Sequence, residues 1–104
     1  MEGLVSVVSF ANVFYVVRKL TDLKAARRTL VILRDVFTPI ACDHHILNQA
    51  IDSELKDFED AIQYFSALHA GADCLVSRNP DDFPRKSDCP VLTPAEFLVA
   101  YGFE

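Results

Sequence analysis

Acidic residues gather in two short stretches of the chain. The first, KDFEDAIQYF at 56–65, places three acids within four positions and then turns apolar, and the second, RNPDDF at 78–83, adds an amide and two more acids. Carboxylate and amide oxygens are hard ligands that suit Mg²⁺ or Mn²⁺, and repulsion among clustered carboxylates favours a cation between them. If the two stretches meet, they can hold a metal that assists the attack of water on a phosphodiester.

The first stretch also has a purely structural interpretation. Asp57 and Asp60 stand at i and i+3 at the start of an amphipathic helix predicted over 57–70. There, carboxylates accept backbone N–H groups and face the positive end of the helix dipole. The acids of 56–65 therefore either start a helix only, or start a helix and bind a metal.

The order of the elements around the two stretches predicts that they face each other. Gly71 ends the helix and leads into DCLVS at 73–77, a short strand that RNPDDF follows directly. The helix then runs antiparallel to the strand, so its amino end lies near the carboxyl end of the strand, where ligands bind in open α/β sheets. We therefore expect Asp60 to lie near Asn79 and Asp82.

The remaining pattern predicts an α/β fold. Leu4–Phe10 is a β-branched, uncharged run typical of a buried strand, and a helix capped by Thr21 presents basic residues on one side. The other predicted elements are a helix from Ala11, a weak edge strand at 37–41, a helix after Asp43, a strand at 90–92 and a last helix with a capping box at 93–96. The order β, α, α, β, α, α, β, β, α indicates a sandwich with a mostly parallel sheet.

Length and composition predict a single domain over 1–104. The chain has 104 residues, of which 51% are hydrophobic, enough for one core. Its longest uncharged stretch, 3–17, is too short to cross a bilayer, and no signal peptide is recognisable, so we expect a cytoplasmic protein with no membrane partner. The three cysteines are far apart and lack the spacing of a metal site, so we interpret them as reduced core residues.

Charge is distributed unevenly along the chain. Residues 1–42 hold six bases and three acids, whereas residues 43–104 hold four bases and twelve acids, which gives +3 and −8 for the two parts and −5 in all. Arg27, Arg28 and Arg34 fit either a solvated helix face or contacts with RNA phosphates or an acidic partner.

Four ordered segments resemble the PIN-domain family: SFANVFYVVRK (9–19), DFEDAIQYFSAL (57–68), ADCLVSRNPDDF (72–83) and PVLTPAEFL (90–98). The resemblance implies a three-layer PIN-like sandwich, in which helices flank a short, mostly parallel sheet. It also implies a metal-dependent ribonuclease, an Mg²⁺ or Mn²⁺ cofactor, RNA as substrate and, for the toxins of toxin–antitoxin pairs, an antitoxin protein as partner. On this pattern Asp60, Asp82 and Asn79 are the metal ligands, and Asn12 joins them in the catalytic site.

Two departures from the family pattern favour an alternative. Asn12 stands where the family usually has Glu, and Asn79 where many members have Asp. The first strand of the family, which carries an Asp-Thr-Asn motif, is missing, so we expect a gap between the strands at 4–10 and 73–77 unless these two pair directly. Open strand edges favour a homo-oligomer. The alternative function is therefore a catalytically inactive PIN-like protein that self-associates or binds a partner.

Overall fold

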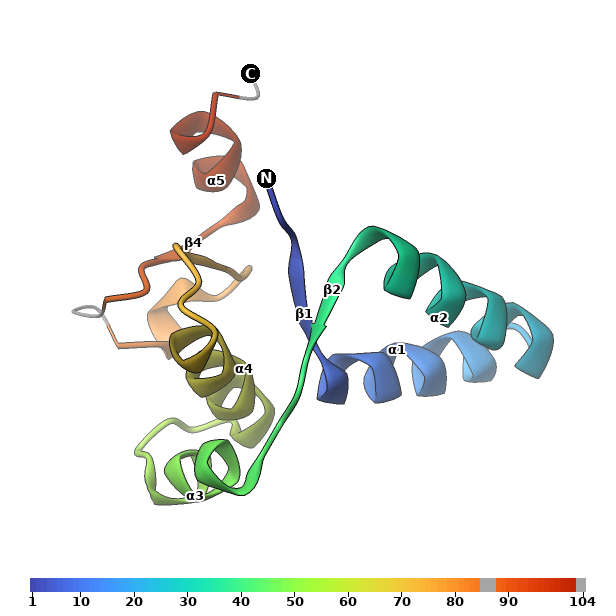
Figure 1. Ribbon diagram of the computed structural model, residues 1–104, viewed down its shortest axis with the longest axis horizontal. Helices are drawn as coiled ribbons and strands as arrows, with labels where there is room; N and C mark the ends of the chain where they lie inside the picture. Colours follow the sequence, from blue (N-terminus) through green and yellow to red (C-terminus); the bar gives the residue numbers. More distant parts are fainter. Residues whose placement is uncertain (85–87, 103–104) are drawn as a thin grey trace. The chain divides into compact units, whose positions relative to one another are not determined.

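The protein is an α/β protein with short parallel strands, and its elements follow the predicted order (Figure 1). The computed structural model describes residues 1–84 and 88–102. The chain forms two compact units, Met1–Cys42 and Asp43–Glu104, which are called the N-terminal and the C-terminal unit below. The single domain and the three-layer arrangement stay predictions.

The N-terminal unit consists of two parallel strands and two helices. Strand β1 (Leu4–Ser6) pairs with β2 (Thr38–Ile40), in the register Leu4↔Thr38. Between them in sequence, α1 (Val7–Leu20) and α2 (Leu23–Val36) pack against each other as a pair of neighbouring helices (Figure 1). Pro39 lies in β2, as the edge-strand prediction for 37–41 requires.

Two helix boundaries of this unit differ from the prediction. The strand expected over 4–10 ends at Ser6, because the Ser6 hydroxyl accepts a hydrogen bond from the N–H of Val8 at 3.2 Å and starts α1 there. Thr21 does not cap α2. Its hydroxyl instead donates to the carbonyl of Val17 at the end of α1, and the Asp22 carboxylate caps α2 by accepting from Ala25 N–H at 2.7 Å.

The C-terminal unit contains three helices and a second pair of strands. Helices α3 (His44–Asp52), α4 (Phe58–His69) and α5 (Pro94–Ala100) begin with side-chain caps from Asp43, Asp57 and Thr93. Gly71, at φ 67°, ends α4 in the left-handed conformation that favours glycine. The remaining elements are β3 (Leu75–Val76), the 3₁₀ helix η1 (Pro80–Asp82) and β4 (Val91–Leu92).

The core of the C-terminal unit is built mainly from α3 and α4. These helices pack against each other, and α4 alone buries five side chains. Phe83, which follows η1, is also buried, at 4% exposure, and Cys89 before β4 is buried too. Burial of the Phe83 side chain therefore anchors the segment that carries the second acidic stretch to the unit's core.

The strands form two separate sheets in the described part of the chain. One sheet has the order β1-β2 and the other β3-β4, and both pairs are parallel. Strand β1 belongs to the N-terminal unit and β3 to the C-terminal unit, so the gap or pairing predicted between the strands at 4–10 and 73–77 stays a prediction. No helix within residues 1–84 and 88–102 has the length and apolar character needed to cross a membrane.

Candidate functional site

Asp60 is held in the first turn of α4. The carboxylate of Asp57, one residue before the helix, accepts a hydrogen bond from the backbone N–H of Asp60 at 2.9 Å. Asp57 is thus occupied as the helix cap, which is the structural role expected for an acid at this position. The side chain of Asp60 does not cap the helix and is half-buried beside it.

Asp82 is held by the packing of its neighbour. Its backbone N–H donates to the Asn79 carbonyl at 3.1 Å, which closes the single turn of η1. The next residue, Phe83, packs its ring against Tyr64 of α4, with centroids 6.1 Å apart. Since Tyr64 stands one helical turn after Asp60, this aromatic contact fixes η1 next to the first turns of α4.

The two carboxylates interact electrostatically. Partial burial raises the pKa of Asp60 above its ordinary value of 3.8, and the negative charges of Asp57 and Asp82 raise it further. A carboxylate with a raised pKa has more to gain from a cation than an isolated one, because the cation offsets both the burial and the repulsion. The helix-start interpretation of the first stretch accounts for Asp57 but not for this interaction of Asp60 with Asp82.

The donor set fits Mg²⁺ or Mn²⁺ better than a soft metal. Asp60 and Asp82 offer hard oxygen atoms, and Mg²⁺ is commonly held by one or two carboxylates while it keeps several waters. Within residues 1–84 and 88–102, no group of three or more His, Cys, Asp or Glu side chains is placed to hold a metal. Any cation at this position therefore depends on this pair of carboxylates together with water and amide oxygens.

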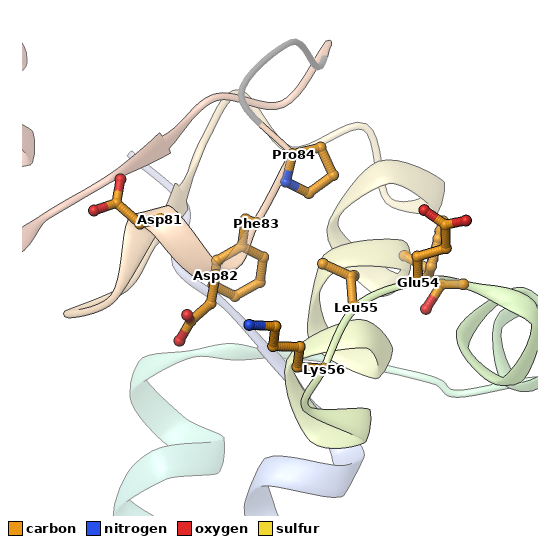
Figure 2. A pocket seen from close by; sticks show the side chains of 9 residues that line it. Glu54, Leu55, Lys56, Asp81, Asp82, Phe83 and Pro84 are labelled. Carbon is orange, nitrogen blue, oxygen red and sulfur yellow. The ribbon is translucent and has the colours of Figure 1, made fainter.

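The other sequence-predicted site residues lie in different surroundings. Asn79 precedes η1 and is exposed; its backbone N–H donates to the Ser77 hydroxyl at 3.1 Å, and its side chain makes no cap to the 3₁₀ helix. Asn12 is half-buried on α1, in the N-terminal unit, and its part in the site stays a prediction. Asp81 is exposed, and Figure 2 shows its carboxylate directed away from that of Asp82.

Asp82 also borders a pocket that the sequence did not reveal. The pocket has a volume of about 370 Å³ and lies between the segment that precedes α4 and the segment formed by the end of η1 and the two residues after it (Figure 2). Its lining residues are Ser53, Glu54, Leu55, Lys56, Phe65, Asp81, Asp82, Phe83 and Pro84. The signals in the sequence were Lys56, the first residue of the first acidic stretch, and Phe83, the last residue of the second.

Comparison with protein families finds a match to the PIN domain over residues 1–81, which is most of the chain. Comparison with curated proteins finds no match, and comparison with solved structures finds none either. The matched region includes β1, all four of the helices α1 to α4, and the start of η1. The chain therefore belongs to the PIN-domain family, a nuclease-like family with an α/β fold.

Proposed function

We propose that the protein is a metal-dependent ribonuclease domain that hydrolyses phosphodiester bonds of RNA with Mg²⁺ or Mn²⁺. Asp60 and Asp82 are the metal ligands, and the amide oxygen of Asn79 is the third protein ligand. The observation that supports the proposal is the contact of Phe83 with Tyr64, which holds the segment of Asp82 against α4, the helix of Asp60, in a chain that belongs to a nuclease-like family.

Each residue has a distinct task in the proposed chemistry. When bound, the cation supplies the Lewis acidity that assists attack of water on the phosphodiester. Asp60 and Asp82 would hold the cation, because carboxylate oxygens are the hard ligands that Mg²⁺ and Mn²⁺ prefer. The amide oxygen of Asn79 binds the cation without adding charge.

Calorimetric titration with Mn²⁺ tests the proposal. We expect the wild-type chain to bind Mn²⁺, and Asp60→Asn and Asp82→Asn to lose that binding, because each removes one of two anionic ligands. Asp81→Asn is the matched control: it removes the same charge from the neighbouring position, where the carboxylate is exposed and points elsewhere. Equal Mn²⁺ affinity in Asp60→Asn and the wild type would remove Asp60 from the site.

Cleavage of single-stranded RNA is the second test. We expect Mn²⁺-dependent fragments that a chelator abolishes and that Asp60→Asn does not produce. In a toxin–antitoxin pair, production of the wild-type chain alone would also arrest bacterial growth, and production of Asp60→Asn would not. Growth arrest that persists in Asp60→Asn would separate any toxicity from the proposed nuclease.

The alternative function, a self-associating PIN-like protein without catalysis, is supported by apolar side chains on the surface of the N-terminal unit. Helix α1 buries none of its residues fully, and exposed apolar side chains on α1 and α2 include Tyr15, Val16, Leu20, Val31, Ile32 and Val36. Such residues gather at protein interfaces. The occupant we propose is a second copy of this chain, since a homodimer covers the same face on both partners.

Light scattering after size exclusion tests self-association. A homodimer has twice the monomer mass, and Leu20→Ser should shift it towards the monomer, because Leu20 is 77% exposed and contributes little to the fold of a single chain. Val99→Ser, at a 63% exposed apolar position of α5 in the other unit, is the matched control. A monomeric wild type would exclude the homodimer, and a dimer without Mn²⁺ binding would favour the alternative function.

A further inference from the structure

The pocket beside Asp82 combines an apolar interior with a charged border. Leu55, Phe65, Phe83 and Pro84 supply the apolar lining, and Phe83 is buried at 4% exposure. The volume, about 370 Å³, lies within the range of about 300–1,000 Å³ that is usual for small-ligand sites. All lining residues belong to the C-terminal unit, so the pocket is a feature of that unit alone.

Lys56 is the cation of this pocket. It is exposed at the pocket's border, and Figure 2 shows its ammonium group on the side where Asp82 lies. Within residues 1–84 and 88–102, the structure gives Lys56 no ion pair. The Glu54 carboxylate, in contrast, is directed away from the Lys56 ammonium group.

A ligand in this pocket would touch the candidate metal centre. Asp82 is at once a lining residue of the pocket and a ligand of the proposed metal centre. A divalent cation bound between the carboxylates of Asp60 and Asp82 offsets their negative charge, whereas the other acids of the lining, Glu54 and Asp81, direct their carboxylates away from Lys56. The Lys56 ammonium group is then the local partner for an anion at the border, while the interior accepts a flat apolar group.

We propose that this pocket is a nucleotide subsite, in which the apolar lining receives one base of single-stranded RNA and Lys56 holds the adjoining phosphate. The ligand class rests on the proposed ribonuclease function. The chemistry fits because a base presents an aromatic face that packs on apolar and aromatic side chains, whereas a phosphate pairs with a lysine ammonium group. The subsite would place a phosphate of the chain beside Asp82.

Titration of the uncharged nucleosides uridine and adenosine into isotope-labelled, metal-free protein locates the base position of the subsite by NMR. We expect amide signals of Leu55, Lys56 and Phe65 to shift, and those of the N-terminal unit to stay unchanged. Shifts spread over both units, or none in the pocket, would overturn the proposal. Because no metal is added, this measurement is independent of whether the carboxylates bind a cation.

Two variants divide the proposal into its charged and apolar halves, with a short fluorescein-labelled single-stranded RNA as the probe. The logarithm of the RNA association constant falls as the logarithm of the salt concentration rises. Lys56→Gln should make this slope shallower by about 0.7, because one phosphate contact is lost. Lys24→Gln, at another exposed lysine, which lies on α2, is the control and should leave the slope unchanged. Equal slopes in both variants would overturn the phosphate contact.

Phe65→Leu tests the apolar half, since it keeps an apolar side chain but removes the ring. Loss of a base–ring contact should weaken RNA binding by about fivefold or more, the lower end of measured base–aromatic contributions. Unchanged affinity would overturn the placement of the base. Lys56→Gln and Phe65→Leu should both bind Mn²⁺ as the wild type does. If the subsite proposal is wrong, RNA binding is unchanged in these variants; if the metal-centre proposal is wrong, the wild type itself binds no Mn²⁺.

Discussion

The rings of Tyr64 and Phe83 lie 6.1 Å apart, and this contact joins the two acidic stretches of the chain. Tyr64 stands one turn after Asp60 on α4, and Phe83 directly follows Asp82. Both aromatic side chains are buried, at 6% and 4% exposure. The position of Asp82 relative to Asp60 is thus set by apolar packing, which works against the repulsion between their charges.

Replacing Phe83 tests this arrangement. Phe83→Ala should lower the free energy of unfolding by about 3–5 kcal/mol, as is usual for a buried phenylalanine. It should also bring the pKa of Asp60 down towards 3.8, because η1 is no longer held beside α4. Phe83→Leu keeps most of the buried volume and should preserve both properties better. Urea denaturation and NMR titration of the carboxyl group measure the two effects; an unchanged Asp60 pKa in a folded Phe83→Ala variant would contradict the argument.

The raised pKa of Asp60 has a defined consequence for stability in metal-free buffer. The folded protein binds a proton at Asp60 more tightly than the unfolded chain, whose pKa is near 3.8. The contribution of Asp60 to stability is therefore greatest below pH 3.8 and falls as the pH rises through the raised pKa. Asp60→Asn should accordingly be more stable than the wild type at neutral pH, and the difference should shrink on acidification. Urea denaturation at several pH values measures this, and a wild type that gains stability over the variant as the pH rises would show the opposite sign.

Neutralising Asp82 should change the pKa of Asp60 while the side chains that bury Asp60 stay the same. Asp82→Asn removes one of the charges that raise the pKa of Asp60, so that pKa should fall, while the part due to burial remains. Asp81→Asn is the control, since the charge of Asp81 does not contribute to the raised pKa of Asp60. Carboxyl NMR titrations of the three proteins provide the measurement. Equal Asp60 pKa values in wild type and Asp82→Asn would show that the two carboxylates lie too far apart to share a cation.

Much of the fold was readable from local patterns, because caps and turns are set by a few neighbouring residues. The capping box at Thr93 and Glu96, the Asp43 cap and the Gly71 helix end are all present in the structure. The end of β1 was not readable in the same way. The intrinsic propensity of Val7, Val8 and Phe10 favours a strand. These residues are nevertheless helical, because Ser6 caps α1 and α1 packs against α2.

For the candidate site, the order of helix, glycine and strand constrains the backbone and predicts that Asp60 and Asp82 lie near each other. A shared metal site at these residues stays a prediction. The pocket forms because particular side chains of 53–56 and 81–84 face each other. These two short segments show no helix or strand periodicity, so the sequence does not indicate which of their side chains face the pocket. Lys56 and Phe83 were therefore missed as functional candidates.

Ser66 offers a test of polar burial inside α4. It is 1% exposed, and its hydroxyl has no hydrogen-bond partner in the described part of the chain. Ser66→Ala removes that unsatisfied group and should raise the free energy of unfolding by about 1 kcal/mol or more. Ser53→Ala is the contrasting variant, because the Ser53 hydroxyl donates to the Ala50 carbonyl at 2.8 Å and its loss should destabilise. Urea denaturation should give opposite signs for the two; destabilisation by both would mean that Ser66 has a hydrogen-bond partner in solution.

Gly3 and Phe37 are in close contact at the start of the β1–β2 pair. The carbonyl of Gly3 accepts a hydrogen bond from Thr38 N–H at 2.8 Å, and a Cβ atom added to Gly3 would lie 2.6 Å from Cδ1 of Phe37. Gly3→Ala should therefore destabilise by about 1–3 kcal/mol, because either the Phe37 ring or the strand must move.

A double-mutant cycle assigns the cause of that loss. Phe37→Leu shortens the side chain that the added methyl group meets, so Gly3→Ala should cost less in the Phe37→Leu background than in the wild type. Urea denaturation of the four proteins gives the coupling energy. A coupling energy near zero would mean that the stability lost in Gly3→Ala arises elsewhere in the strand. A clear coupling energy would show that the pairing of β1 with β2 requires room for the Phe37 ring at position 3.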